Sequence, residues 1–232
     1  MDDRIGSALR EARIRQKRTL RGVALATGIS ASLLSQVETG KSQPSVSTLY
    51  TLVSHLGLSL DEVLGLEVAG RRTTAEPGSR PVVLEPDETG TTIQRAADNP
   101  VLDMDNGVRW ERLAIDGSRS VEPLLVTYEP GASSSVDGGL MRHPGTEHAY
   151  LLDGELTLRF EYDEHVLRAG DSFSFHSDRP HLYVNHTDAP ARGLWFVVGR
   201  TGPVRPRDWL AEPPAELFEL LGHPLPATSD ER

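Results

Sequence analysis

The sequence predicts a multidomain α + β fold in which an N-terminal bundle of five helices precedes an antiparallel β-sandwich or barrel. Apolar residues recur at helical spacing up to about residue 66. The next stretch, EVAGRRTTAEPGSR, has no period and is rich in Gly, Pro, Thr and charge, which is typical of a linker. Short runs of strand-favouring residues then alternate with turn residues. We therefore expect domains at residues 1–67 and 81–200, a linker at 68–80, and a Pro-rich tail at 201–232 with one short helix from Pro214 to Leu221.

The first, fourth and fifth helices follow from apolar spacing and from capping residues. The first is expected from about Arg4 to Gln16, with one apolar stripe made of Ile5, Ala8, Leu9 and Ala12. Pro44 and Ser45 precede the fourth helix, whose apolar face is Val46, Leu49, Leu52, Val53 and Leu56. Ser59 and Glu62 have the spacing of a capping box at the start of a short fifth helix.

Residues 20–41, LRGVALATGISASLLSQVETGK, predict two short helices that meet at a tight turn. Thr19 can cap the first of these helices, Gly28 supplies a residue that tolerates positive φ, and Ser30 can cap the second. The second helix carries small and polar side chains on the face that Leu34 and Val37 do not use. This layout is typical of a helix-turn-helix, whose second helix enters the major groove of DNA.

The charge of the chain is unevenly distributed, although its net value is −10. Residues 1–41 hold eight Lys and Arg against four Asp and Glu, net +4, which leaves −14 for residues 42–232. A local positive face can attract phosphates while the acidic remainder keeps the protein in solution. The basic end is also the end with the helix-turn-helix pattern, which favours nucleic acid as a partner.

Composition and the first residues limit the compartment and the chemistry. Cysteine is absent from the sequence, which excludes disulfides and thiolate metal sites. The start, MDDRIGSALREARIRQ, lacks the apolar run of a signal peptide, and no stretch has the length needed to span a bilayer. We expect a cytoplasmic protein with no membrane partner.

The segments TLRGVALATGISASLLSQVETGKSQPS and SLDEVLG resemble the DNA-binding domain of the phage-repressor-like, xenobiotic-response-element class of bacterial regulators. The likeness covers residues 4–66. It implies base-edge contacts from the start of the second helix of the motif, a backbone contact from Arg21, phosphate contacts near Lys41, and a structural role for Glu38. The predicted DNA-binding residues are Arg21, Ser30, Ala31, Ser32, Ser35, Gln36, Lys41 and Ser42.

The strands of the second domain are expected in seven runs. These are PVVLEP, VRWERLAI, LLVTYEPG, AYLLDGELTLRF, HVLRAGDSFSF, HLYVNHT and GLWFVVG. Many short strands at this spacing favour an antiparallel sandwich or barrel. Asp153-Gly154 is a hairpin signal between its two flanking runs.

Two segments of this region, HPGTEHAYLLDG and the stretch from Gly170 to Asn185, resemble the paired motifs of the cupin superfamily, a double-stranded β-helix or jelly roll. The likeness covers about residues 81–200. It matches His143, Glu147 and His181 to three of the four metal ligands of that family, whereas Met141 stands in place of the first histidine. Two His and one carboxylate suit iron, manganese, nickel or zinc with open coordination positions. The alternative is a barrel that has kept its fold and lost the metal, with no other cofactor.

The remaining polar and aromatic residues of the barrel have plainer expected roles. Three histidines match no motif position and are expected at the surface or rim: His148, His176 and His186. Glu147 and His148 are neighbours on a strand and should point to opposite faces. Most aromatic residues should fill the core. Four arginines could meet the carboxylate of a ligand: Arg109, Arg112, Arg142 and Arg159. The alternative is that they face solvent, and we expect this for at least three of the four.

These patterns predict a sequence-specific transcriptional regulator rather than an enzyme, and no catalytic residue is assigned. Its partners would be operator DNA, a small-molecule effector or metal sensed by the cupin domain, and a second copy of the chain in a homodimer or higher homo-oligomer. The alternative from another class is a two-His, one-Glu iron oxygenase or epoxidase with an accessory helix-turn-helix. A third hypothesis is a protein-interaction module whose helices never touch DNA, which the basic residues disfavour.

Overall fold

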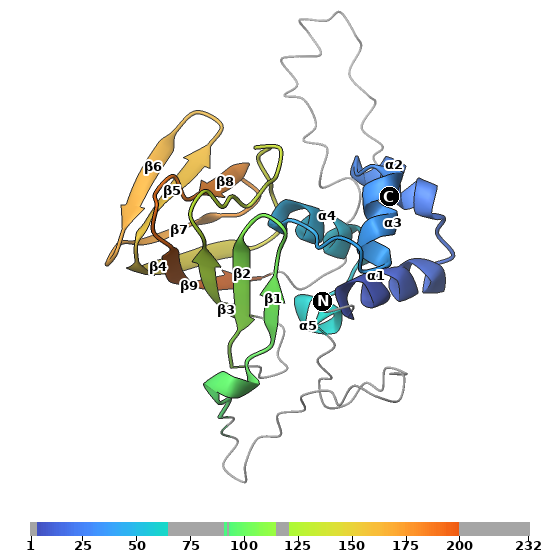
Figure 1. The fold of residues 1–232 in the computed structure, drawn as a ribbon, viewed down its shortest axis with the longest axis horizontal. Coiled ribbons are helices and arrows are strands. Elements are labelled where there is room, and N and C mark those ends of the chain that lie inside the picture. The colour runs from blue at the N-terminus through green and yellow to red at the C-terminus, as the bar shows by residue number, and fades with distance from the viewer. Residues whose placement is uncertain (1–3, 65–90, 92, 115–120, 200–232) are drawn as a thin grey trace, which may run out of the picture. The chain divides into compact units, whose positions relative to one another are not determined.

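The computed structural model describes residues 4–64, 91, 93–114 and 121–199, all within one compact unit. Its helices are those that the sequence predicts (Figure 1). In chain order they are α1 (Arg4–Arg15), α2 (Leu20–Thr27), α3 (Ala31–Glu38), α4 (Val46–Leu56) and α5 (Leu60–Val63). The predicted linker at residues 68–80, the strand at 81–86 and the tail at 201–232 with its helix lie outside the described residues. The predicted domain limits therefore stay predictions.

The helix ends confirm the capping predictions. The Thr19 side chain accepts a hydrogen bond from the backbone of Gly22, and Ser30 accepts one from Leu33. Ser59 and Glu62 form the complete capping box. Such side chains satisfy backbone N–H groups that have no partner within the first turn of a helix. The sequence therefore determines where each of these helices begins.

The turn between α2 and α3 has helix-turn-helix geometry. Gly28 ends α2 with φ 72°, a left-handed conformation that glycine adopts without steric cost. The two helices bend by 118° at this break, which lies within the range of the motif. No single helix among the described residues is long and apolar enough to cross a membrane, and α2 with α3 passes that test only as a bent pair, on length and composition.

The β part consists of two antiparallel sheets (Figure 1). Six strands form the first sheet, in the order β1 (Val101–Asp103), β2 (Val108–Arg112), β3 (Val121–Tyr128), β9 (Ala191–Val198), β4 (Thr146–Asp153) and β7 (Ser172–His176). The second sheet has the order β6 (Glu164–Arg168), β5 (Glu155–Phe160) and β8 (His181–Val184). A short 3₁₀ helix, η1 (Ala96–Asp98), precedes β1. The sandwich of short strands is as predicted, except that the three residues of β1 were too few to give a sequence signal.

The hairpin prediction at Asp153-Gly154 is wrong. β4 pairs with β7 and β9, whereas β5 pairs with β6 and β8, so the chain passes from one sheet to the other at this dipeptide. Gly154 has φ 79°, and a Cβ atom there would overlap the carbonyl oxygen of Pro190. The same left-handed conformation that closes a hairpin here makes a corner between sheets.

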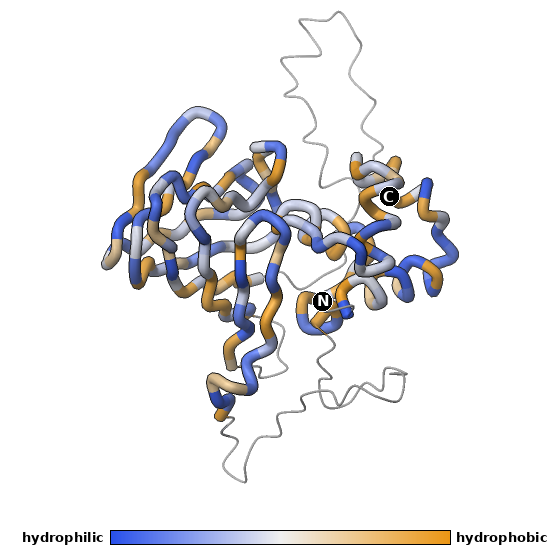
Figure 2. The backbone as a smooth tube through the Cα atoms, in the orientation of Figure 1, coloured by the Kyte–Doolittle hydropathy of each residue, from blue (hydrophilic) through white to orange (hydrophobic). Residues whose placement is uncertain are grey.

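Side chains alternate between the interior and the surface along the central strands. On β4, Glu147, Ala149 and Leu151 are buried whereas His148, Tyr150 and Leu152 are exposed. Figure 2 shows that short hydrophobic and hydrophilic stretches follow one another along the strands of both sheets. This period of two is that of a strand with one buried face. It determines which residues of β4 reach the interior, and Glu147 is one of them.

Candidate functional site

The second helix of the motif, α3, has one buried face and one exposed polar face. Leu34 and Val37 are buried in the helical core, whereas Ala31, Ser32 and Gln36 are exposed. Ser35 is half-buried at the edge of the exposed face. The exposed side chains are short or carry an amide, and a Gln amide can donate and accept at a base edge. The exposed face of α3 therefore carries short and polar side chains, whereas its apolar face is buried.

Glu38, on the same helix, has a structural role. Its carboxylate is buried and accepts two hydrogen bonds from the guanidinium of Arg13 on α1, at 2.6 and 2.7 Å. The hydrogen bond to Glu38 raises the pKa of Arg13. This paired geometry fixes α3 against α1, because a bidentate pair restricts both distance and orientation. The structural role predicted for Glu38 is confirmed.

The residues that flank α3 differ in how accessible they are. Arg21 and Lys41 are exposed. Ser30 is exposed, but its hydroxyl caps α3. Ser42 is half-buried, and its hydroxyl donates to the carboxylate of Asp105, which lies in the loop between β1 and β2, at 2.7 Å. A phosphate would have to compete with that carboxylate for the Ser42 hydroxyl.

The three residues matched to cupin ligands come together in the interior of the β part. Their potential ligand atoms all lie within 4.8 Å of one another, and we call His143, Glu147 and His181 the triad. Glu147 lies on β4 and His181 begins β8, so the triad joins the two sheets. Each side chain is at most 3% exposed.

Backbone hydrogen bonds place the segment that carries His143 beside β8. Met141 and His181 exchange two backbone hydrogen bonds, at 2.8 and 2.9 Å, and the His143 amide donates to the carbonyl of Ser177. These bonds bring together residues that are far apart in sequence. Met141 also lines a small cavity beside Glu147, so the residue in place of the expected first histidine does face the interior.

The hydrogen bonds around the triad determine which atoms face its centre. His143 Nδ1 lies 3.2 Å from the Pro144 carbonyl oxygen, and His181 Nδ1 lies 2.8 Å from that of Arg179. A carbonyl oxygen only accepts, so each Nδ1 carries a hydrogen and each Nε2 is turned toward the centre of the triad. The two Nε2 atoms lie 2.9 and 3.2 Å from the same oxygen of Glu147. The triad thus directs two imidazole nitrogens and one carboxylate oxygen at a common point.

Glu147 is held in its charged form. Burial by itself raises the pKa of this carboxyl, but the imidazoles of His143 and His181 outweigh burial and hold the pKa well below its ordinary value. The other carboxylate oxygen accepts a hydrogen bond of 2.6 Å from the Tyr183 hydroxyl. Burial and the nearby carboxylate raise the pKa of Tyr183 well above its ordinary value, so this phenol stays a donor. These outer contacts orient the carboxylate as those of metal-binding carboxylates do.

A cavity of about 20 Å³ adjoins the triad, which is room for about one water molecule. Its walls include Glu147, Met141 and the aromatic rings of Trp110, Tyr128 and Tyr183. Two further wall residues, Val46 and Tyr50, belong to α4. The Tyr50 ring stacks on His143, with centroids 4.3 Å apart and planes at 16°. Val46 was predicted only as helical core and Tyr50 was not singled out, because helical spacing does not reveal that a second part of the chain covers α4.

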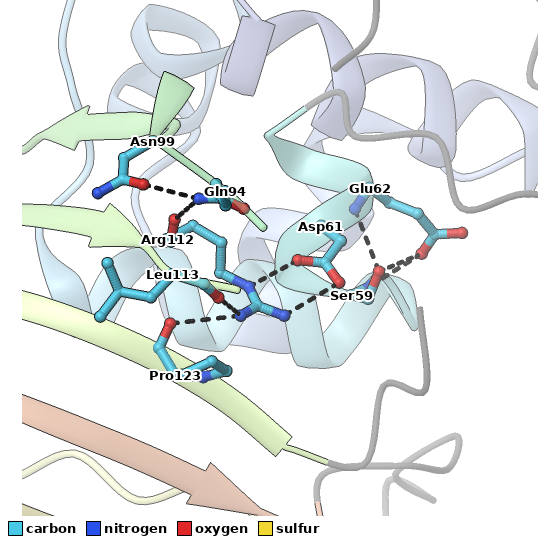
Figure 3. Close-up of polar contacts among 8 residues, drawn as sticks. All are labelled: Ser59, Asp61, Glu62, Gln94, Asn99, Arg112, Leu113 and Pro123. Carbon is cyan, nitrogen blue, oxygen red and sulfur yellow. Dashed lines mark hydrogen bonds and ion pairs between the residues drawn. The ribbon is translucent and has the colours of Figure 1, made fainter. Parts of the chain in front are cut away.

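A second contact that sequence reasoning missed is the ion pair of Arg112 with Asp61 (Figure 3). Arg112 on β2 donates to both carboxylate oxygens of Asp61 on α5, at 2.8 and 3.4 Å, and also to the carbonyls of Leu113 and Pro123. The Arg112 side chain is 1% exposed. Arg112 was expected to face solvent or to meet the carboxylate of a ligand. It does neither, because its guanidinium is buried against Asp61. An acidic residue in the first turn of a helix is common, so Asp61 gave no signal of a distant partner.

The other predicted surface residues are largely where the sequence places them. His148, His176 and His186 are exposed, as expected for histidines outside the motif. Tyr150 and Phe196 are exceptions to the expectation that aromatic residues fill the core. They lie on the outer face of the six-stranded sheet, where they are 45% and 39% exposed.

Comparisons with known proteins agree with both halves of this description. The helix-turn-helix family HTH_3 matches residues 9–63, and the cupin domain family Cupin_2 matches residues 124–197. The HTH-type transcriptional regulator PuuR of Escherichia coli is 28% identical over 182 residues, covering 78% of this chain and 86% of its own length. The HTH-type transcriptional regulator SutR of the same organism is 24% identical over 182 residues, which are also 78% of this chain and 86% of the length of SutR. A crystal structure of an HTH_3 family transcriptional regulator from Vibrio cholerae has the same fold, with a TM-score of 0.58 at 20% identity, covering 85% of this chain and 96% of its own.

Proposed function

We infer that this protein is a DNA-binding regulator of transcription. It joins a helix-turn-helix domain to a cupin domain, and it is homologous to HTH-type transcriptional regulators. The observation that carries this proposal is the exposed polar face of α3 on a helix pair bent by 118°. The face is presented outward while Leu34 and Val37 anchor the helix. Such a helix can enter the major groove without loss of its core contacts. We expect the protein to act in the cytoplasm.

The contacts to DNA would divide into base-reading and phosphate-binding residues. Gln36, with the exposed start of α3, would read base edges, whereas Arg21 and Lys41 would bind phosphates. Replacement of Gln36 by Ala should therefore reduce discrimination between cognate and random duplexes. Replacement of Lys41 by Ala should weaken both equally and lower the salt slope of log K by about 0.9. Equal loss by both variants on both duplexes would contradict this placement of α3.

A homodimer is part of the proposal, because two half-sites about 34 Å apart give more specificity than one. The register of the central strands suggests a surface for it. Leu194 on β9 and Tyr150 on β4 pair on the outer face of the sheet, and Pro123 and Phe196 form the adjoining row of that face. An apolar outer face on a sheet is typical of an interaction surface. Replacement of Phe196 by Glu should lower the mass in analytical ultracentrifugation, whereas the same change at Tyr162, which is 90% exposed, should not.

The cupin domain is proposed to sense a ligand, and the triad supports a divalent metal such as iron, manganese, nickel or zinc. The fit rests on the hydrogen-bonded Nδ1 atoms, which turn both Nε2 atoms toward one oxygen of Glu147, so that two imidazole nitrogens and a carboxylate oxygen converge. A bound metal would supply a Lewis-acidic centre with open positions for water or a small effector. Metal content should fall in His143→Ala and persist in His148→Ala, whose exposed ring neighbours Glu147. Equal, near-zero content in wild type and both variants would leave a metal-free sensor pocket.

A two-His, one-Glu oxygenase is the second candidate, because the triad has the ligand set of such enzymes. The helix-turn-helix domain and the similarity to HTH-type transcriptional regulators argue for the regulator. The test is oxygen consumption by the Fe²⁺-loaded chain compared with Glu147→Gln. The regulator proposal expects equal rates, and faster turnover by the wild type would favour the enzyme.

A further inference from the structure

The helix that follows the recognition helix forms part of the wall of the buried site. Val46 and Tyr50 lie one turn apart on α4 and both line the cavity beside the triad. The neighbouring positions Leu49, Leu52 and Val53 are also buried, in the helical core. α4 thus has one side on the triad and another on the helices that hold α3. A displacement of one side of a rigid helix displaces the other.

Several contacts hold α4 and its neighbours against the β part. The Tyr50 ring stacks on His143 at 4.3 Å and lies 5.4 Å from the ring of Trp110. The Ser47 amide donates to the Ser134 carbonyl at 2.9 Å. Of these contacts, the stack is the one that involves a member of the triad, so it is the contact that a change at the triad would alter first.

We propose that the contact of Tyr50 with His143 changes when a divalent cation binds the triad. Through this contact, cation binding in the β part is coupled to the position of the DNA-binding helices. This inference rests on the proposed function. A metal bound at Nε2 gives the His143 imidazole cationic character, and a cation within about 6 Å of a tyrosine ring centroid is attracted to its face. Metal binding therefore strengthens the stack of Tyr50 on His143 and holds α4 against the β part. Metal removal weakens the same stack and lets α4 move. Tyr50 acts through His143 and is a positioning residue, not a ligand.

The coupling predicts a reciprocal change in two affinities. If metal changes the affinity for DNA by a given factor, DNA changes the affinity for metal by the same factor, typically about 5- to 150-fold. The full-length chain is tested with Co²⁺ alone as the metal, with its visible absorption as the measure of occupancy. The DNA is the duplex that the wild type selects from a random pool, and its affinity is measured by anisotropy with Co²⁺ and after chelation.

Two substitutions at one position separate the ring from its bulk. Tyr50→Phe keeps the ring and should keep at least fivefold coupling, whereas Tyr50→Leu keeps apolar bulk and should reduce the coupling below twofold while still binding Co²⁺. Tyr162→Leu, at an exposed position, should leave the coupling unchanged. If Tyr50→Leu unfolds, Tyr50→Met replaces it, because its flexible thioether fills irregular space.

The outcomes distinguish this inference from the function beneath it. A wild type that binds both DNA and Co²⁺ with less than twofold coupling overturns the inference and leaves the regulator intact. Coupling that survives in Tyr50→Leu also overturns it. A wild type that binds no Co²⁺ removes the metal as the signal and the inference with it. A wild type that selects no duplex contradicts the proposed function itself.

Discussion

The exposed face of α3 and the buried triad are two polar sites that the chain assembles in opposite ways. α3 takes Ala31, Ser32 and Gln36 from a single turn and a half of helix and leaves them in solvent. The triad takes Glu147 from β4, His181 from β8 and His143 from the segment before β4, and buries all three. The first site needs α3 with its cap and its contacts to the helical core, whereas the second needs both sheets of the sandwich to come together. Damage to distant contacts should therefore harm the second site far more than the first.

The largest expected effect follows from the buried pair of Arg112 with Asp61, a contact that joins residues distant in sequence (Figure 3). Replacement of Asp61 by Ala leaves the guanidinium buried without its counter-charge, and this should lower the free energy of unfolding by about 3–5 kcal/mol. Urea denaturation followed by circular dichroism measures the change.

A second Arg–Asp pair of nearly equal length provides the control. Arg109 and Asp103 approach to 2.9 Å, against 2.8 Å for the buried pair, but their side chains are 43% and 70% exposed. Solvent screens such a pair, so Asp103→Ala should cost at most about 1 kcal/mol. Similar losses in the two variants would show that burial of the Arg112 pair does not govern its contribution.

A smaller effect is expected at the hydroxyl that orients Glu147. Tyr183→Phe removes the donor at 2.6 Å and keeps the ring, so the fold should persist. Loss of such an outer contact commonly lowers metal affinity by about 10- to 100-fold. Competition titration with a chromophoric chelator measures the affinity for Co²⁺. An affinity equal to that of the wild type would mean that the carboxylate is oriented without Tyr183.

The contrast between the two sites also explains which features the sequence could predict. The five helices, their caps and the exposed face of α3 depend on residues a few positions apart, such as Ser30 with Leu33. The hairpin at Asp153-Gly154 was predicted wrongly because positive φ at Gly154 is compatible with a corner as well as a hairpin. The stack of Tyr50 on His143 could not be predicted, because it depends on how two parts of the chain pack. Motif spacing did identify the triad, since the family resemblance supplies long-range information that periodicity lacks.

The smallest effect is expected where structure is most local. Ser30 caps α3 by accepting a hydrogen bond of 3.1 Å from the Leu33 amide. Ser30→Ala should lower the free energy of unfolding by about 1 kcal/mol, because that amide loses its protein partner. Ser32→Ala, two residues further into the exposed face of the same helix, should change stability by less than about 0.5 kcal/mol. Neither change should alter Co²⁺ affinity. A lower Co²⁺ affinity in Ser30→Ala would show that the triad depends on the start of α3.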